Sequence, residues 1–425
     1  MDVFQIEGPT RLSGHVEVNG SKNASLPIMA ATLLAPGVST LLGVPRLADI
    51  NVCKDLISQL GCPVDRHEDG MLTIDATTID NPVGPYDIVR KMRASICILG
   101  PLLARCRRAE VSMPGGCAIG DRPINLHVTG LRQLGAQIHL KNGYVIAEAP
   151  GGLTGASIFL GGSFGSTVLG TANVMMAATL AKGRTIIESA ACEPEITDLA
   201  NCLNAMGARV SGIGSPRLVI EGVSHLRPVQ YRVIPDRIEA GTFMAAAAIT
   251  GGEVEIGNCR LDDLMAVVDK LRNIGVTVEA GGDGCTVAGA DRPKPSDITT
   301  QPYPGFPTDL QAQFMTLLAL ADGNSVVIEK IFPDRFMHVA ELNRMAANLR
   351  KEGSTVIVAG VGRLIAAPVM ASDLRASAAL VLAGLAAEGT TTINRVYHID
   401  RGYERIELRL NPLGARITRE ESGTV

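Results

Sequence analysis

The loop at residues 113–123 carries the side chain in this sequence best suited to react. It reads Met113-Pro114-Gly115-Gly116-Cys117-Ala118-Ile119-Gly120-Asp121-Arg122-Pro123, and its glycines predict an exposed loop rather than a packed segment. A free thiol has a pKa near about 8.5, and a nearby cation such as Arg122 raises the fraction that is ionised. The same thiol can act as a general acid, because its pKa lies close to the working pH. A single loop cysteine is by itself more often incidental than catalytic, so the prediction that Cys117 reacts also depends on its surroundings.

The other cysteines and the histidines indicate no second reactive centre. Nine cysteines are spread singly along the chain without a CxxC pair, which indicates free thiols in a reducing compartment. Most of them lie in apolar or helical patterns and are interpreted as small core residues. The seven histidines show no HExxH or similar spacing, so no metal site is predicted. Gly20-Ser21-Lys22-Asn23 lacks the spacing of a P-loop, and Gly161–Gly165 is not a dinucleotide fingerprint.

Polar residues gather at six places where a helix is expected to begin. A helix N-terminus presents free N–H groups and about half a positive charge, so it attracts anions. A cation in a first turn opposes that charge and needs a reason, which anion binding would supply for Lys22, Arg93 and Arg375. The alternative for the hydroxyl and carboxylate residues is simple N-capping. The six segments are Ser21–Ala24, Lys91–Ser95, Gly162–Ser166, Asp236–Glu239, Thr308–Gln311 and Asp373–Ser377.

A faint six-fold repeat predicts how these segments are positioned. Six times, a helical pattern ends at a glycine and a short β-prone segment follows, which is helix-stop punctuation before a strand. The glycines are spaced 74, 72, 68, 78 and 61 residues apart. Equivalent positions of a repeat lie at one end of a fold, so the helix N-termini should form an anion-binding surface. The glycines of this series are Gly61, Gly135, Gly207, Gly275, Gly353 and Gly414.

A second series of helix ends interleaves with the first. Ala-rich helical patterns stop in five units at Gly37, Gly183, Gly252, Gly323 and Gly389, while the second unit has Arg107-Arg108 instead. Each unit of about 70 residues therefore reads strand, helix, strand, helix and then one or two strands. Six such units divide naturally into two similar domains of three, with the join between the strand near Leu218–Ile220 and Asp236.

Composition and charge narrow the class of protein. The chain has 425 residues, long enough for two cores, and with no Trp and 3% aromatic residues the cores must be aliphatic. A net charge of −4 argues against a general nucleic-acid binder. The N-terminus shows no signal-peptide pattern, and the longest apolar run, near Ala376–Ala387, is too short to span a membrane. We therefore expect a cytoplasmic protein that binds neither nucleic acid nor membrane.

Several long segments of the sequence resemble the enolpyruvyl transferase family, and the resemblance runs nearly end to end. The fold it implies is an inside-out α/β barrel in two domains of three βαβαββ units each, 21–232 and 1–20 plus 233–425. The segments that carry it are Gly20–Ala24, Met92–Ser95, Pro114–Pro123, Phe306–Gln313, Asp334–His338, Asp373–Ser377 and Tyr397–Glu404.

The resemblance also implies a reaction, without a cofactor or an obligate protein partner. The enolpyruvyl group of phosphoenolpyruvate would pass to the 3′-hydroxyl of UDP-N-acetylglucosamine, releasing phosphate, in the first committed step of peptidoglycan biosynthesis. Cys117 matches the proton donor of the family, which also forms a covalent adduct and is alkylated by the epoxide inhibitor fosfomycin. Asp309 matches the residue that binds the sugar hydroxyl and takes its proton, and Asp373 one that stabilises the cationic centre or relays a proton.

The remaining matched residues are implied to bind the substrates. Lys22, Arg93, Arg122 and Arg401 would hold phosphoenolpyruvate, with Arg375 nearby. The implied sugar-nucleotide contacts are Asn23, Arg122, Pro123, Ile124, Asn125, Leu126, Gly161, Gly162, Ser163, Phe164, Ile331 and Arg335.

The sequence departs from the family pattern at two of these positions. Relatives often carry a basic residue just ahead of Ser163, where this chain has Gly161-Gly162, and often an aspartate at Asn125. These differences affect nucleotide contacts rather than the chemistry. Two alternatives remain: the branch of the family that acts on shikimate 3-phosphate, and a non-catalytic protein that binds a UDP-sugar.

Overall fold

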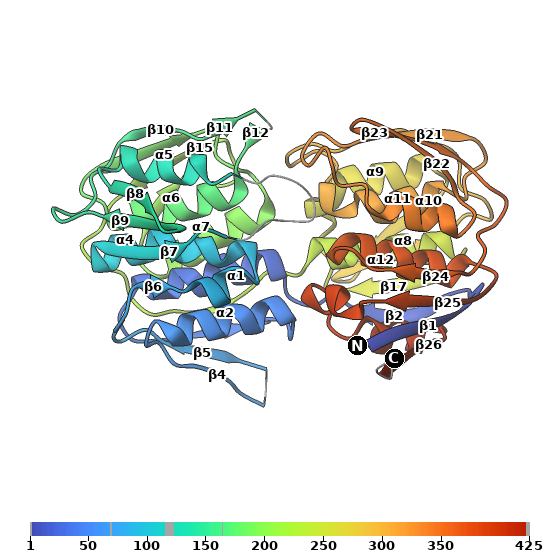
Figure 1. Ribbon diagram of the computed structural model, residues 1–425, viewed down its shortest axis with the longest axis horizontal. Helices are drawn as coiled ribbons and strands as arrows, with labels where there is room; N and C mark the ends of the chain where they lie inside the picture. The colour runs from blue at the N-terminus through green and yellow to red at the C-terminus, as the bar shows by residue number, and fades with distance from the viewer. Residues whose placement is uncertain (1, 69, 115–122, 164, 422–425) are drawn as a thin grey trace. The chain divides into compact units, whose positions relative to one another are not determined.

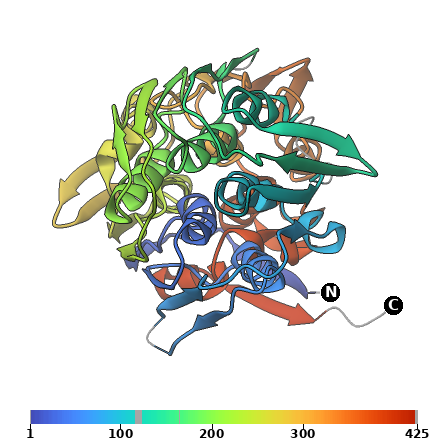
Figure 2. The ribbon, with the colours of Figure 1, turned by 90° about the vertical axis from the view of Figure 1, so that its left-hand side faces the viewer.

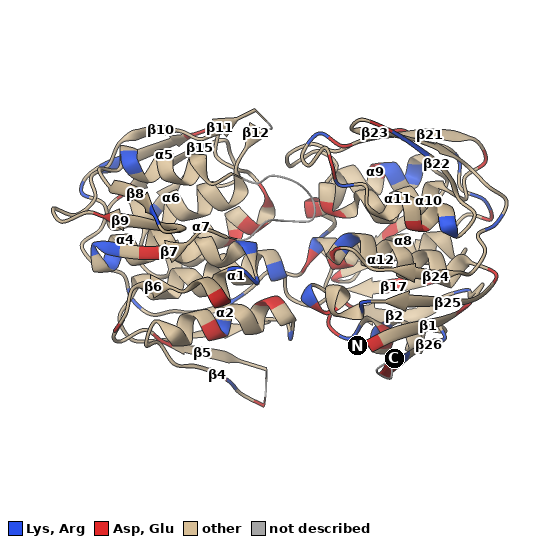
Figure 3. Cartoon of the chain, in the orientation of Figure 1, with Lys and Arg blue, Asp and Glu red and all other residues tan. Residues whose placement is uncertain are grey.

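The structure is a computed structural model that describes residues 2–68, 70–114, 123–163 and 165–421, and they form two compact units (Figure 1). One unit is built from the described residues between 20 and 234. The other combines residues 2–19 with 235–421. Charged residues of both signs are distributed over each unit (Figure 3). Among the described residues, no helix has the length and apolar character needed to cross a membrane.

The described residues of each unit include three four-stranded sheets with one shared topology. The first strand of a repeat pairs in parallel with the second, and the fourth lies antiparallel between the second and the third. In the unit of residues 20–234 the sheets are β16 (Gln230–Arg232), β3 (Val38–Leu42), β5 (Leu72–Asp75) and β4 (Val64–Arg66); β6 (Val83–Gly84), β7 (Arg108–Ser112), β9 (Tyr144–Glu148) and β8 (Gln137–Lys141); and β10 (Ser157–Phe159), β13 (Arg184–Glu188), β15 (Arg217–Glu221) and β14 (Arg209–Ser211). A short hairpin joins β11 (Gly161–Gly162) to β12 (Gly165–Ser166).

The sheets of the other unit repeat this order. They are β2 (Ser13–Glu17), β17 (Glu253–Gly257), β19 (Gly284–Ala288) and β18 (Thr277–Gly281); β20 (Ile298–Thr299), β21 (Asn324–Ile328), β23 (Thr355–Ala359) and β22 (Asn348–Glu352); and β24 (Pro368–Met370), β25 (Gly389–Asn394), β1 (Asp2–Gly8) and β26 (Ile417–Glu421).

Three strands complete sheets that lie far away in the sequence. β16 pairs with β3 so that Tyr231 lies opposite Leu41, and this supplies the first strand of the first repeat. The N-terminal strands β1 and β2 complete the sixth and fourth repeats, with Ile6 opposite Thr391 and Val16 opposite Ile256. Each unit therefore holds three complete βαβαββ repeats, which confirms the predicted fold class.

The first helix of each repeat lies in the interior of its unit. In the unit of residues 2–19 and 235–421, α8, α10 and α12 pack against one another and are buried on almost every side. Their many alanines permit this close approach, because small side chains let helix axes come together. The inner helices are α1 (Lys22–Ala31) with η1 (Thr32–Leu34), η2 (Arg93–Ile98) with α4 (Leu99–Cys106), α6 (Val168–Ala178), α8 (Arg237–Ile249), η4 (Thr308–Leu310) with α10 (Gln311–Leu318), and α12 (Leu374–Ala386).

The second helix of each repeat is amphipathic and packs by one face. In α9, for example, Val267, Val268 and Leu271 are buried while the rest of the helix is mostly exposed. Figure 2 views the unit of residues 20–234 from its end, with helices toward the middle and strands around the rim. The remaining helices are α2 (Ala48–Gln59), α3 (Tyr86–Val89), α5 (Asn125–Gln133), α7 (Pro194–Ala205), η3 (Leu261–Leu264), α9 (Met265–Asn273), α11 (His338–Arg344), η5 (Val396–Arg401), α13 (Ile406–Leu410) and η6 (Asn411–Leu413).

The glycine punctuation is confirmed in five repeats and was wrong in the fifth. Gly61, Gly135, Gly207, Gly275 and Gly414 all have φ between 91° and 103°, the left-handed conformation that ends a helix. Gly353 instead lies in the turn between β22 and β23, and the position equivalent to the other glycines is held by Ala346, with φ 67°. The prediction failed because alanine occupies a conformation that is unfavourable for a residue with a Cβ atom.

Two smaller differences concern where inner helices begin and end. The helix of the fourth repeat is followed by Gly251, with φ 59°, and not by Gly252 as predicted. In the third repeat, α6 begins at Val168 with Thr167 as its N-cap, so the predicted start at Gly162–Ser166 was several residues too early. Those residues form the β11–β12 hairpin instead.

Candidate active site

Asp309 is the centre of the most densely connected polar cluster in the described structure. It lies in η4, just before α10, where Pro307 rather than an aspartate is the N-cap residue. Its Oδ1 accepts a hydrogen bond from Nη1 of Arg335 at 2.8 Å, and its Oδ2 accepts one from Nη2 of Arg375 at 3.1 Å. The interpretation of Asp309 as a plain N-cap is therefore wrong, because its carboxylate pairs with two guanidinium groups.

The three charged side chains differ in their access to solvent. The Arg335 and Arg375 side chains are 7% and 3% exposed, whereas that of Asp309 is 26% exposed. Burial opposes ionisation of Arg375, but its interactions with Tyr403 and Asp309 raise its pKa above the ordinary value, so it is fully charged. A carboxylate anchored from behind by two buried cations and open on another side can orient a hydroxyl group and accept its proton.

Arg335 is itself held by a second polar chain. Its Nη1 also donates to Oγ1 of Thr308 at 3.0 Å, and that hydroxyl donates to the Glu329 carboxylate at 2.9 Å. The buried Glu329 carboxylate also accepts the backbone N–H groups of Ile331 and Phe332 at 2.8 and 2.9 Å. One buried carboxylate therefore fixes both Arg335 and the segment that contains Ile331.

Asp373 is the N-cap of α12, as the capping interpretation predicted. Its Oδ1 accepts the N–H groups of Arg375 and Ala376 at 2.8 and 3.1 Å. Its other carboxylate oxygen accepts no hydrogen bond from the described residues, so capping leaves half of the group unused. The neighbouring His338 is buried, and burial lowers its pKa to about 4 although Asp373 acts in the opposite direction, so that imidazole is neutral at pH 7.

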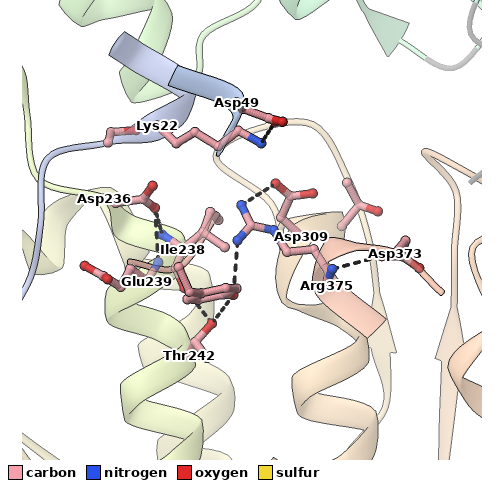
Figure 4. A network of polar contacts seen from close by, with 12 residues as sticks. Lys22, Asp49, Asp236, Ile238, Glu239, Thr242, Asp309, Asp373 and Arg375 are labelled. Atoms are coloured by element: carbon pink, nitrogen blue, oxygen red, sulfur yellow. Dashed lines mark hydrogen bonds and ion pairs between the residues drawn. The ribbon is translucent and has the colours of Figure 1, made fainter. Parts of the chain in front are cut away.

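In the other unit, Lys22 has a buried carboxylate as a partner. Lys22 begins α1, whose N-cap Ser21 accepts the N–H of Ala24, and its Nζ lies 3.0 Å from Oδ2 of Asp49 at the start of α2 (Figure 4). The two side chains are only 11% and 4% exposed. Asp49 offsets the unfavourable position of a cation in the first turn of a helix, and this gives Lys22 a structural reason besides anion binding.

The other predicted binding residues lie at equivalent ends of elements. Arg93 begins η2, Asn125 begins α5, and Arg401 ends η5. Ile124 is buried just ahead of α5, while Pro123 and Asn125 are exposed and Leu126 is partly so. Gly161 and Gly162 form β11, Ser163 lies in the turn that follows, and Asn23 is partly buried in the first turn of α1. Cys117, Arg122 and Phe164 lie outside the described residues.

The described cysteines are poor nucleophiles by environment. Burial raises the pKa of Cys62 to about 11 and that of Cys97 to about 12, and it raises those of Cys53 and Cys202 still further. Thiols buried in this way stay protonated and unreactive at neutral pH. The interpretation of these four as core residues is confirmed.

Several residues of the cluster were missed from the sequence. Thr242 and Gln313 are polar residues inside otherwise apolar inner helices, and their buried position was the available signal. Asp49, Glu329 and Tyr403 gave no such signal, because their partners are distant in the sequence.

Comparison with known proteins places the chain in a family. A family model described as EPSP synthase (3-phosphoshikimate 1-carboxyvinyltransferase) matches residues 6–410. The chain belongs to the EPSP synthase family. Similar members are named UDP-N-acetylglucosamine 1-carboxyvinyltransferase: that of Trichlorobacter lovleyi is 56% identical over 420 residues, and that of Klebsiella pneumoniae 53% over 421, each covering 99% of both chains.

Solved structures of family members share the fold. The enolpyruvyl transferase NikO from Streptomyces tendae aligns with a TM-score of 0.89 at 25% identity and covers 98% of both chains. An EPSP synthase from Acinetobacter baumannii aligns with a TM-score of 0.73 at 20% identity, covering 99% of this chain and 100% of its own. These neighbours agree with the two units of three repeats described above.

Proposed function

We propose that this chain transfers the enolpyruvyl group of phosphoenolpyruvate to the 3′-hydroxyl of UDP-N-acetylglucosamine and releases phosphate, in the cytoplasm, as the first committed step of peptidoglycan biosynthesis. One observation carries the choice of acceptor. Relatives that share 52–56% of residues over 99% of both chains bear the name of that activity, whereas the EPSP synthase from Acinetobacter baumannii shares 20%. The described parts of 21–232 and of 1–20 plus 233–425 would be its two enolpyruvyl transferase domains.

Binding of phosphoenolpyruvate requires several cations, because it carries a phosphate and a carboxylate. Lys22, Arg93, Arg122 and Arg401 would supply them, with Arg375 nearby. Three of them, Lys22, Arg93 and Arg401, lie at the ends of short helical segments. Asp49 would hold the Lys22 ammonium in place while leaving donors for a phosphate oxygen.

The chemistry needs one proton donated to carbon and one removed from oxygen. The Cys117 thiol would protonate the methylene carbon of phosphoenolpyruvate and leave C2 cationic. The sugar 3′-oxygen then attacks C2 while Asp309 takes the hydroxyl proton. The new methyl group next loses a proton as the C2–O bond to phosphate breaks, so that the double bond reforms and phosphate leaves with the electron pair.

The described carboxylates support this division of roles. Asp309 is partly exposed and held by Arg335 and Arg375, which suits a group that orients a hydroxyl. The oxygen of Asp373 that capping leaves unused is a candidate to stabilise the cationic centre or to relay a proton.

The sugar nucleotide would contact a separate group of residues. Glu329 supports two of them, since it holds Ile331 through its backbone N–H and Arg335 through Thr308. Because Gly161-Gly162 and Asn125 replace charged residues of relatives, diphosphate and uridine contacts there would be weaker. The full set is Asn23, Arg122, Pro123, Ile124, Asn125, Leu126, Gly161, Gly162, Ser163, Phe164, Ile331 and Arg335.

A phosphate-release assay tests the proposal. The purified chain is given phosphoenolpyruvate with UDP-N-acetylglucosamine, with shikimate 3-phosphate, or with neither. Release with the sugar nucleotide alone is expected. Release with shikimate 3-phosphate would transfer the chain to the other branch of the family, and no release with either acceptor would leave the alternative of a binding protein.

A further inference from the structure

Tyr403 lies at the centre of a polar cluster inside the helical core of its unit. The residue follows η5, and it is 1% exposed. Its hydroxyl lies within hydrogen-bonding distance of Nη1 of Arg375 at 3.0 Å, Oγ1 of Thr242 at 2.8 Å and Nε2 of Gln313 at 3.3 Å. These partners come from α12, α8 and α10, the three inner helices that pack together.

The direction of each hydrogen bond follows from the number of protons available. The Thr242 hydroxyl donates its single proton to the backbone oxygen of Ile238 at 2.8 Å, so towards Tyr403 it can only accept. Tyr403 therefore donates its own proton to Thr242. Because that proton is fixed, the lone pairs of the phenolic oxygen are left to accept from Arg375 and Gln313.

Arg375 has few other acceptors. Its Nη2 donates to Asp309, while its Nε is buried without a hydrogen-bond partner among the described residues. The guanidinium carbon also lies 5.4 Å from the centre of the Tyr403 ring. The position of this buried cation therefore depends on two side chains, the Tyr403 hydroxyl behind it and the Asp309 carboxylate in front (Figure 4 labels Arg375, Asp309 and Thr242).

The same cluster also holds the main chain at Asp309. Nε2 of Gln313 donates to the backbone oxygen of Asp309 at 3.0 Å and lies 3.2 Å from Oγ1 of Thr242. The cluster thus reaches Asp309 by two routes, one through the Arg375 side chain and one through Gln313 to the backbone.

We propose that Tyr403 is a positioning residue for the reaction: its hydroxyl, oriented by Thr242, holds the Arg375 guanidinium on the carboxylate of Asp309. This inference rests on the proposed function for its kinetic consequence, though the placement of Arg375 does not. Tyr403 touches no substrate in this account and acts only through Arg375.

The test compares Tyr403→Phe with Thr316→Val. Phenylalanine keeps the ring and its packing but removes the hydroxyl. Thr316 also carries a buried hydroxyl, on α10 one turn beyond Gln313, but this donates to the backbone oxygen of Ala312 at 3.0 Å and is not part of the Tyr403 cluster. Both variants should lose similar thermal stability, so a difference in function between them separates positioning from folding.

Two measurements are expected to distinguish the variants. In Tyr403→Phe, kcat should fall at least about tenfold, the loss of one oriented interaction, while Thr316→Val keeps the kcat of the unsubstituted chain. Without its acceptor, Arg375 should hold Asp309 less closely, so the acidic limb of the pH–kcat profile should move to higher pH. Carbon-13 NMR of labelled aspartate, with Asp309 assigned through Asp309→Asn, should show its pKa raised in Tyr403→Phe without any substrate.

Each failure points to a different error. If the unsubstituted chain releases phosphate and Tyr403→Phe matches it in kcat and in pH profile, the positioning role is wrong and the proposed function stands. If the unsubstituted chain is inactive, the proposed function fails, and the Asp309 titration still decides: an unchanged or lowered pKa overturns the inference. If Tyr403→Phe does not fold, Thr242→Val removes the acceptor of the phenolic proton and should change the same two readouts in the same direction.

Discussion

Replacing Asp309 by asparagine should destabilise its unit and abolish most activity. The substitution removes the negative charge between Arg335 and Arg375, whose side chains are 7% and 3% exposed and lie 2.8 and 3.1 Å from the carboxylate. Breaking a buried ion pair on one side costs about 3–5 kcal/mol, because the partner charge stays buried. Asp309 is itself 26% exposed and asparagine keeps one acceptor, so we expect the low end, about 3 kcal/mol.

The effect is measurable by calorimetry and kinetics. For a unit of roughly 200 residues, about 3 kcal/mol corresponds to a fall of about 6–12 °C in melting temperature. Loss of a group that orients the acceptor and takes its proton should lower kcat by a factor of about 10² or more.

Asp322→Asn is the matched control, because it removes the same charge from an exposed pair in the same unit. Asp322 lies 3.1 Å from Arg292, but these side chains are 72% and 51% exposed, and such pairs contribute less than about 1 kcal/mol. If Asp309→Asn melted as the control does, the two arginines would not depend on Asp309 as the geometry requires. Full activity in Asp309→Asn would refute its proposed role.

Three further predictions follow from other parts of the chain. Burial raises the pKa of Glu239 from 4.5 to about 7, against Arg409 and the Asn19 hydrogen bonds; the folded chain then holds an extra proton between those values, so stability should fall by about 3 kcal/mol as pH rises through this window, and Glu239→Gln should flatten that slope in urea titrations. Ala346→Gly should raise stability by about 0.5–1 kcal/mol, because glycine tolerates φ 67°, and a lower melting temperature would contradict this. Cys117→Ser should abolish the mass increase caused by fosfomycin, and modification that persists would assign the reactive thiol elsewhere.

The architecture could be predicted from the sequence because it depends on local signals that recur. Each repeat must end a helix with a left-handed residue, and glycine marks that position in five of the six described cases. The exception, Ala346, carries no such mark, which is why the fifth copy was placed at Gly353. The strands that close the sheets, such as β16 beside β3, leave only a weak trace, because their partners lie about 190 residues away.

The interior of the candidate site could not be predicted in the same way. Lys22 and Asp49 are 27 residues apart, and Thr242 and Tyr403 are separated by 161. Such pairs depend on how helices pack and on the direction of each hydroxyl proton, and neither leaves a pattern in the sequence. The charged residues at helix starts were recognisable, whereas the groups that hold them in place were not.

The central claim concerns which acceptor receives the enolpyruvyl group, and identifying the product tests it most directly. The chain is incubated with phosphoenolpyruvate and UDP-N-acetylglucosamine, and the products are examined by NMR and mass spectrometry while phosphate is measured in parallel. The account predicts one enolpyruvyl ether at the 3′-oxygen of the sugar nucleotide for each phosphate released. Phosphate release without that ether, or an unchanged sugar nucleotide, would contradict it.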